Sequence, residues 1–300
     1  MIRIILNGKK ADNEEIRQAV MTLRGEGVKV EVRVTWEKGD AERFAIEACR
    51  EDVVRLVVAG GDGSINEVLN GLMKVPKEKR PVLAILPLGT ANDFATACQI
   101  PFLPLEALRL AVEGEVYPVD IVKANERYFL NVASGGFGAQ IVADTPTSLK
   151  NFLGGGAYTL SAVIKALNYT PHKGRLIADG LDIEGESLAT LICNGRQAGG
   201  GQMLAPNAYI DDGLLDIVVI MEFPIVDLGQ VIAEMRDYER SGTYVKRFQK
   251  EWIESIPYQK RSVNLDGEPY EADTIHFEIV SKELDLVLPK GCPTLHPVEK

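Results

Sequence analysis

The sequence predicts an α/β domain followed by a β domain: a doubly wound parallel sheet with helices on both faces, then a mostly antiparallel β-sandwich. Three observations predict this. Apolar segments of strand length alternate with segments of helical period over the first third of the chain. After about Val119 helical periods become rarer, and β-rich runs separated by glycine and turn residues follow. A glycine-rich turn at Gly60 directly follows an apolar strand.

The first 120 residues contain the alternating part. Ile2–Leu6 is a short apolar run, and 28–34 alternates valine with charged residues, so both are expected to be strands. The expected strands are 2–6, 28–34, 56–59 and 82–86, and the expected helices are 13–24, 40–50 with Asp40 as N-cap, and 66–73. This order implies a Rossmann-like sheet, in which ligands bind beyond the carboxyl ends of the strands.

The second domain is expected to be β-rich. The expected strands are 128–133, 188–193, 214–221, 262–265, 274–280 and 284–288, with helical inserts at 157–167 and 225–240. The composition changes near 119–122, which divides the chain into domains 1–120 and 121–290. Residues 291–300 are then a C-terminal tail that could return to the first domain.

Composition and charge exclude several classes of protein. Apolar residues make up 46% of the 300 residues and charged residues 25%, which favours a packed core over disorder. The net charge of −10 argues against duplex nucleic acid as a partner and against a broad polybasic membrane anchor. The four cysteines are scattered without a CxxC pair, which indicates reduced thiols. With neither a signal peptide nor a spanning segment, a soluble cytoplasmic protein is expected.

The glycine-rich turn is the sharpest local signal. Gly60-Gly61-Asp62-Gly63-Ser64 follows an apolar strand and opens a helix, where backbone N–H groups and the helix dipole favour an anion. Without side chains, the glycines let a phosphate approach the main chain. Asp62 could hold a magnesium ion directly or through water. The turn is neither a Walker A loop nor a spaced dinucleotide fingerprint, and an ordinary tight turn is the alternative.

A second polar loop follows the next strand. Pro87 and Gly89 shape this turn, and Thr90, Asn92 and Asp93 are small polar residues at the strand exit. Alone it is typical of a capped helix start. Together with the first loop, it predicts the other wall of a nucleotide-binding crevice.

These two loops resemble the paired signature of the diacylglycerol-kinase catalytic family, and most closely the YegS-like bacterial lipid kinases. The segments 34–40, 194–202 and 264–269 resemble that group as well. The resemblance implies a magnesium-dependent kinase that transfers phosphate from ATP to a hydroxyl of a membrane lipid such as phosphatidylglycerol or diacylglycerol. It implies nucleotide contacts from Thr35, Gly61, Asp62, Gly63, Ser64, Ile65, Asn66, Glu67 and Thr90. Ser64 stands where the family usually has threonine, which keeps the hydroxyl.

The resemblance implies two further sites. One is a magnesium or calcium site in the second domain, formed by the Asp212 carboxylate and the main-chain carbonyls of Tyr209 and Leu214, although Asp211-Asp212-Gly213 alone favours a plain turn. The other is the proton acceptor at Glu268, with Asp266 as a supporting residue. An acidic hairpin turn is the alternative for this pair.

Other functions remain open on the sequence alone. An NAD kinase shares the Gly-Gly-Asp-Gly turn, and a sphingoid-base or ceramide kinase is closer still. A nucleotide-binding regulator without catalysis would be expected to lose Glu268, which is present. A lipid-carrier module would need no ATP site. The predicted partners are ATP and a membrane lipid reached by transient peripheral contact.

Overall fold

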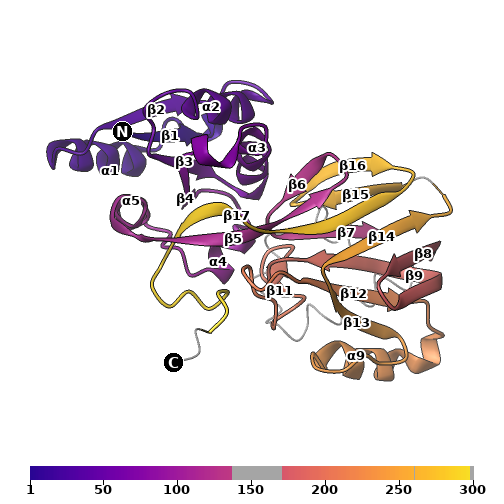
Figure 1. Ribbon diagram of the computed structural model, residues 1–300. Coiled ribbons are helices and arrows are strands. Elements are labelled where there is room, and N and C mark those ends of the chain that lie inside the picture. Colours follow the sequence, from indigo (N-terminus) through magenta and orange to yellow (C-terminus); the bar gives the residue numbers. More distant parts are fainter. Residues whose placement is uncertain (137–170, 260, 298–300) are drawn as a thin grey trace.

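The computed structural model describes residues 1–136, 171–259 and 261–297 (Figure 1). Strands and helices alternate in its N-terminal part. The elements there are β1 (Ile2–Leu6), η1 (Gly8–Lys10), α1 (Glu14–Gly25), β2 (Val30–Val34), α2 (Asp40–Ala48), β3 (Arg55–Gly60), α3 (Asp62–Leu72), η2 (Lys77–Lys79), β4 (Val82–Pro87), α4 (Asp93–Ala97) and α5 (Pro104–Glu113).

The rest of the described chain is mostly strand. Its elements are β5 (Glu115–Ala124), β6 (Arg127–Phe129), β7 (Val132–Gly136), β8 (His172–Ala178), β9 (Leu181–Cys193), β10 (Gln197–Ala198), β11 (Gln202–Met203), β12 (Leu215–Met221), η3 (Ile225–Asp227), α9 (Leu228–Arg236), β13 (Val245–Lys250), β14 (Trp252–Pro257), β15 (Arg261–Leu265), β16 (Glu268–Ala272) and β17 (Ile275–Leu288). The predicted helix 157–167 lies outside the described residues. Within those residues, no helix is both long and apolar enough to cross a membrane.

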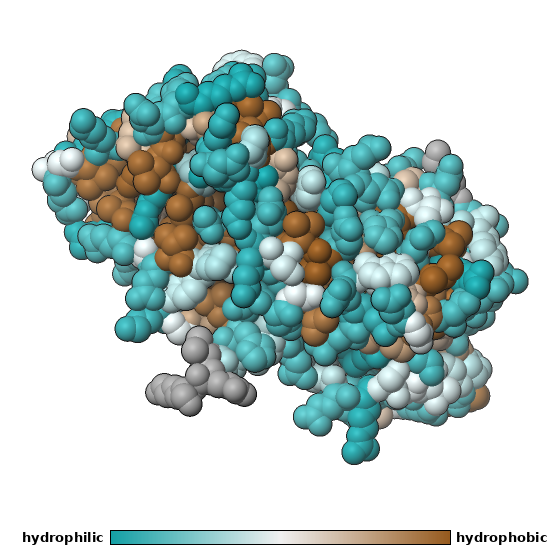
Figure 2. Space-filling model, in the orientation of Figure 1, coloured by the Kyte–Doolittle hydropathy of each residue, from teal (hydrophilic) through white to brown (hydrophobic). Residues whose placement is uncertain are grey.

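The first domain is a parallel sheet in the order β2-β1-β3-β4. Side chains alternate between its faces because the strand period is two. Ile5, Val58 and Ile85 pack beneath α2 and α3, whereas the neighbouring strand residues, such as Ile4 and Val57, pack beneath α1 and α5. The predicted doubly wound architecture is confirmed. Hydrophobic residues gather around α1 and α5 on an otherwise mostly hydrophilic face (Figure 2).

The second domain is antiparallel throughout its described strands. Strands β15, β7, β9, β8, β14 and β17 pair in that order, β16 extends one edge, and β12 joins β9 to β13. Their inner faces enclose a second core that includes Ile192, Ile217 and Phe277. Phe129 meets Phe277 edge to face at 6.2 Å between ring centroids. The predicted β-sandwich class is therefore also confirmed.

Strands β5 and β17 run through both domains. Leu284–Leu288 of β17 pairs with 115–119 of β5, and Leu286 also pairs in parallel with Leu83 of β4, which adds both strands to the first sheet. The register shifts between Val280 and Leu284, where Lys282 has φ 54°. The Asp120 carboxylate secures this bend by accepting the N–H of Lys282 at 2.6 Å.

The return to the first domain thus begins at Leu284, earlier than the predicted tail at 291. The apolar pattern of 284–288 indicated a strand, but a strand pattern does not say which sheet it joins. The residues after β17 remain on the first domain, because Cys292 and Leu295 pack into the core beneath α2 and α3.

Some predicted element boundaries differ from the structure. α3 begins at Asp62, inside the glycine-rich turn, rather than at residue 66. Asp40 is the first residue of α2 rather than its N-cap, which is Gly39 with φ 90°. The Asp40 carboxylate instead accepts the N–H of Trp36 at 2.7 Å and of Glu37 at 3.1 Å, so it closes the loop before the helix.

Candidate active site

The carboxyl ends of β1, β2, β3 and β4 open into a cleft of about 1010 Å³ between the first domain and the tip of the β15–β16 hairpin. Parallel strands bring their exit loops to one edge of the sheet, so loops distant in sequence meet there. The polar and charged residues that line the cleft are Asn7, Lys9, Lys10, Thr35, Glu37, Lys38, Ser64, Glu67, Thr90 and Glu268.

Glycines let the two polar loops touch. A Cβ atom on Gly61 would lie 2.9 Å from the Gly89 Cα, and one on Gly89 would lie 2.5 Å from the Gly61 Cα. Both distances are shorter than real contacts of a Cβ atom, so neither position accepts a side chain without moving the backbone. The Leu88 N–H donates to the Gly60 carbonyl at 2.9 Å and joins the loops. Gly60, Gly61, Gly63 and Gly89 all line the cleft, so main chain forms part of its floor.

Short polar side chains hold the loops in place. Asn7 Nδ2 donates to Ser64 Oγ at 3.2 Å, and the Gly8 N–H donates to Thr35 Oγ1 at 3.1 Å. Asn92 Oδ1 accepts the Gly89 N–H at 2.7 Å. The Ser64 and Thr35 hydroxyls thus lie at the edge of the cleft with defined positions.

Six of the nine predicted nucleotide contacts line the cleft, namely Thr35, Gly61, Gly63, Ser64, Glu67 and Thr90. The Ile65 side chain faces the core and is 3% exposed. Asn66 Nδ2 donates to the Tyr128 carbonyl at 3.0 Å, which ties α3 to the start of the second domain. These two side chains lie on the buried face of α3 and hold the helix in place. A linear motif does not show which face of a helix is buried.

Asp62 lies beneath the cleft floor, close to two other carboxylates. Burial raises its pKa to about 6, and the nearby Asp93 and Asp266 carboxylates add to this, while the N–H groups of Phe94 and Asp93 oppose it. Its Oδ1 is buried without a hydrogen-bond partner among the described residues. A buried carboxylate oxygen among like charges suits a hard divalent cation.

Asp93 links the two domains. It is 4% exposed, and its carboxylate accepts the N–H of Gly200 at 2.9 Å and of Gly201 at 2.6 Å. Both glycines have positive φ, 82° and 93°, which directs these N–H groups toward α4. The main-chain N–H groups of these two glycines therefore bind a carboxylate of the protein itself.

Glu268 comes from the second domain and reaches the cleft of the first. A Cβ atom on Gly63 would lie 3.1 Å from Glu268 Oε1, so this carboxylate rests against the first turn of α3. Lys38 Nζ lies 3.4 Å from Glu268 Oε2 and forms an ion pair across the cleft. The glycine-rich turn and the predicted proton acceptor are therefore adjacent, although about 200 residues separate them in the sequence.

Asp266 has a different position from its predicted partner. It is buried in the turn before β16 with φ 51°. Its oxygens accept the N–H groups of Leu130 at 2.8 Å, Asn131 at 3.0 Å and Val132 at 3.0 Å. Asp266 thus holds the hairpin turn on the chain between β6 and β7, and it supports Glu268 through the backbone.

The predicted second-domain cation site lies in the loop before β12. Asp212 Oδ1 accepts the Leu214 N–H at 3.0 Å, and burial and the carboxylates of Asp120 and Asp211 raise the pKa of Asp212. The Tyr209 ring packs on His296 of the tail at 5.0 Å between ring centroids. In the described segments, no group of three or more His, Cys, Asp or Glu side chains has metal-binding geometry.

The sequence reasoning missed several cleft residues. Asn7, Gly8, Lys9 and Lys10 follow β1 directly, and Trp36 follows β2. The rule that ligands bind beyond the carboxyl ends of parallel strands could have pointed to these exits as well as to those after β3 and β4.

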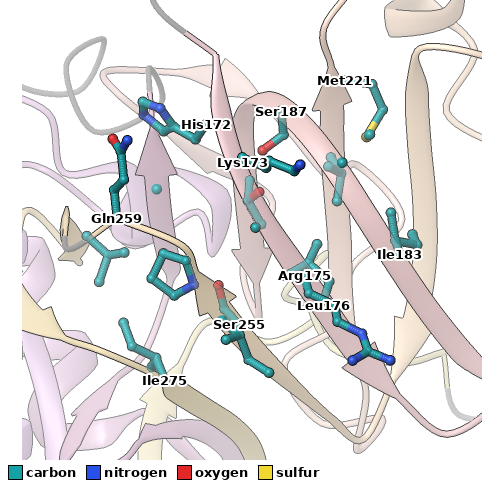
Figure 3. Close-up of a pocket in the computed structure, with 18 of the residues that line it drawn as sticks. His172, Lys173, Arg175, Leu176, Ile183, Ser187, Met221, Ser255, Gln259 and Ile275 are labelled. Atoms are coloured by element: carbon teal, nitrogen blue, oxygen red, sulfur yellow. The ribbon is translucent and has the colours of Figure 1, made fainter.

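A second hollow, of about 100 Å³, lies in the second domain among β8, β9, β14 and β15 (Figure 3). Aliphatic side chains such as Leu176, Ile183 and Ile275 form part of its wall. His172 and Gln259 lie at one end and Arg175 at the other. The described residues that line it include none of the predicted site residues, so the cleft of the first domain is the candidate site.

Comparison with known proteins finds relatives along nearly the whole chain. The diacylglycerol kinase catalytic domain matches residues 1–124, and the YegS C-terminal NAD kinase beta sandwich-like domain matches residues 131–288. A Shewanella frigidimarina protein named "Probable lipid kinase YegS-like" is 48% identical over 295 residues, covering 98% of this chain and 96% of its own. "Probable lipid kinase YegS" of Escherichia fergusonii is 42% identical over 293 residues, 97% of each chain.

A solved structure is similar as well. The crystal structure of "a putative diacylglycerol kinase" from Bacillus anthracis superposes with a TM-score of 0.80 at 26% sequence identity. The match covers 97% of this chain and 98% of that one, so both domains are shared.

Proposed function

We propose a reaction for this chain, which belongs to the diacylglycerol kinase catalytic domain family and is a lipid kinase related to YegS. In the proposed reaction, the γ-phosphate of ATP is transferred to a hydroxyl of a phosphatidylglycerol- or diacylglycerol-class membrane lipid. Glu268 is the proposed general base. One observation carries the proposal. Glu268 of the second domain rests against Gly63 in the first turn of α3 and lines the same cleft as the glycine-rich turn.

The cleft floor is suited to a triphosphate. α3 begins at Asp62, between the lining residues Gly61 and Gly63, and the positive end of a helix dipole favours an anion at such a helix start. Gly61 and Gly89 pack against one another and so bring the two loops together at the floor of the cleft. We assign the remaining contacts to Thr35, Ser64 and Thr90, whose hydroxyls can donate to phosphate or ribose, and to Glu67.

Magnesium is expected to accompany the nucleotide. Asp62 fits this role because its Oδ1 is buried without a hydrogen-bond partner among the described residues and lies among like charges. A bound magnesium ion would neutralise developing charge on the phosphates. Both oxygens of the Asp93 and Asp266 carboxylates accept main-chain N–H groups, so Asp62 Oδ1 is the oxygen of these three carboxylates without a hydrogen-bond partner among the described residues.

A second cation is proposed in the second domain, held by Asp212 and the main-chain carbonyls of Tyr209 and Leu214. The half-buried Asp212 carboxylate has a raised pKa beside the carboxylates of Asp120 and Asp211, and a cation would relieve that repulsion. Magnesium or calcium fits these oxygen donors. Asp120 also holds the bend of β17, so a cation here would stabilise the junction between the domains.

The proposed reaction is a direct displacement. Glu268 takes the proton of the lipid hydroxyl as that oxygen forms its bond to the γ-phosphorus. The bond from the γ-phosphorus to the bridging oxygen breaks, and ADP leaves with that oxygen. Glu268 then returns its proton to water. The acceptor must approach from the open side of the cleft, and we propose peripheral contact with the inner face of the cytoplasmic membrane.

The decisive experiment offers the protein several acceptors. Radiolabelled ATP and magnesium are incubated with a total bacterial lipid extract, with NAD or with a sphingoid base, and each product is identified by mass spectrometry. Label in a glycerolipid supports the proposal. Label on NAD or on the sphingoid base would assign that acceptor instead, and ATP binding without transfer to any acceptor would make the protein a nucleotide-binding regulator.

A further inference from the structure

Among the described residues that line the cleft, Lys38 is the one that forms an ion pair with Glu268. Its Nζ lies 3.4 Å from Glu268 Oε2, and the pair joins the loop before α2 to the start of β16. The Lys38 side chain is 82% exposed and that of Glu268 is 33% exposed. An exposed ion pair of this length is weak, because water screens it, so it can open at little cost.

The backbone that carries Lys38 is held on both sides. Asp40 accepts the N–H groups of Trp36 and Glu37, and its other oxygen receives Arg43 at 2.6 Å. Gly39 follows with φ 90°. The main chain of Lys38 is therefore fixed at the cleft rim while its long side chain extends into solvent. A long side chain on a fixed main chain can exchange one anionic partner for another.

The same point of the cleft has excess negative charge. Burial raises the pKa of Glu67, and the Glu268 carboxylate adds to this, whereas the Lys38 ammonium opposes it. The three side chains therefore interact electrostatically across the cleft. A triphosphate that enters beside Glu67 and Glu268 needs a nearby cation to offset the repulsion.

The glycine-rich turn itself supplies no cation. Phosphate-binding loops of other nucleotide enzymes place a lysine on the β- and γ-phosphates, but Gly60 to Ser64 contains none. The cations among the described lining residues are Lys9, Lys10 and Lys38. Lys9 and Lys10 follow β1, whereas Lys38 is the one already against the proposed base.

We propose that Lys38 binds the terminal phosphate of ATP, and that it exchanges Glu268 for this phosphate when the nucleotide enters. The exchange frees the Glu268 carboxylate to face the acceptor hydroxyl. It also places the cation that the glycine-rich turn lacks on the oxygens of the group being transferred. This role rests on the proposed function and adds a residue to it.

The test measures nucleotide binding without lipid. Calorimetric titration of ATP, ADP and AMP with magnesium compares the wild type with Lys38→Met and Lys38→Arg, and with Lys79→Met, an exposed lysine outside the cleft. Lys38→Met is expected to weaken ATP binding by about tenfold or more, because a charge-assisted contact to phosphate is lost. AMP binding should not change. Lys38→Arg should stay within about threefold of the wild type because it keeps the charge.

A second pair of variants separates binding from mere positioning of Glu268. Glu268→Gln removes the partner charge, and ATP should bind this variant at least as tightly as the wild type, because no ion pair must open. Adding Lys38→Met to Glu268→Gln should again weaken ATP binding by about tenfold. A lysine that only positioned Glu268 would have no effect in that background.

Two results would overturn the role of Lys38 while leaving the kinase proposal intact: equal ATP affinity of the wild type and Lys38→Met, or an equal loss of ATP, ADP and AMP binding. If the wild type itself binds no ATP, the proposed function fails, and the role of Lys38 fails with it. ATP titration of the wild type therefore distinguishes the two failures: ATP binds if only the role of Lys38 is wrong, and it does not bind if the proposed function is wrong.

Discussion

Glu268 reaches the cleft because Asp266, two residues earlier, holds the hairpin turn with three main-chain hydrogen bonds. At the scale of single residues, these two neighbouring acids have different roles. The buried acid fixes the backbone, and the partly exposed one faces the cleft. A motif of two carboxylates flanking a glycine therefore contains one structural residue and one candidate base.

Glu268→Gln is expected to lower kcat by about 10²- to 10⁴-fold, because the amide cannot accept the hydroxyl proton. The fold should be intact, since the side chain is at the cleft surface. Steady-state kinetics with lipid vesicles and urea unfolding would measure the two effects. Glu271→Gln is the matched control on the same strand, with an exposed side chain. Wild-type turnover of Glu268→Gln would contradict the assignment.

Asp40 gives a prediction for acid stability. The Trp36 N–H, followed by Arg43 and the Glu37 N–H, lowers the pKa of Asp40 to about 2 from an ordinary value of 3.8. Because the folded-state pKa is below the unfolded value, ionised Asp40 stabilises the fold above about pH 4. This contribution is lost as the pH falls from about 4 to about 2.

The variant Asp40→Asn should therefore be less stable than the wild type at pH 6, and the difference should shrink between pH 4 and pH 2. Urea unfolding at pH 6, 4, 3 and 2 measures it. Asp52→Asn, at an exposed position, controls for a general change in charge. A stability difference that did not vary with pH would show that the carboxylate charge is not what holds the loop.

At the scale of elements, the site depends on two loops that follow adjacent parallel strands. β3 and β4 pair in register up to Gly60 and Pro87, so their exit loops leave the sheet side by side. Gly61 and Gly89 then touch through their main chains. The contact explains why each loop needs a glycine at that point, and it joins the two loops into one surface at the proposed nucleotide site.

Gly89→Ala should disturb both loops, because its Cβ would lie 2.5 Å from the Gly61 Cα. Backbone cannot move aside as easily as a side chain, so we expect a cost of about 1–3 kcal/mol in the free energy of unfolding. ATP binding should weaken as well. Urea unfolding and ATP titration measure the two effects.

Gly25→Ala, in α1, serves as the comparison, because a Cβ atom there meets nothing within 4 Å. That change should be neutral or stabilising, since alanine is favoured in helices. Equal stability of Gly89→Ala and the wild type would contradict the tight contact between the loops.

For the molecule as a whole, the two domains are joined by long strands and by a buried carboxylate. β5 and β17 contribute to both sheets, and Asp93 of α4 accepts two N–H groups from the second domain. These links hold the two domains together on either side of the cleft, and they keep Glu268 beside α3.

Asp93→Ala should destabilise the protein by about 2–4 kcal/mol, because it leaves the N–H groups of Gly200 and Gly201 without their charged acceptor. Urea unfolding measures the change, with Asp12→Ala as an exposed control. Hydrogen exchange should show faster exchange at Gly200 and Gly201 in the variant. Unchanged stability together with unchanged exchange would contradict the role of this link.

The sequence alone determined the classes of both domains and most strands of the first. It also located the two polar loops, because strand periods, glycine turns and loop residues act locally. Boundaries inside the loops were less accurate. α3 begins within the glycine turn, and Asp40 closes a loop rather than capping a helix, because helix starts depend on which N–H groups find partners.

Only the tertiary structure decided how distant segments combine. It placed Leu284–Leu288 in the first sheet, directed Ile65 and Asn66 inward, and set Gly200 and Gly201 on Asp93. It also brought Lys38 and Glu268 within 3.4 Å of one another. Such contacts join residues far apart in the chain, and they form only when both domains pack, so no local pattern encodes them.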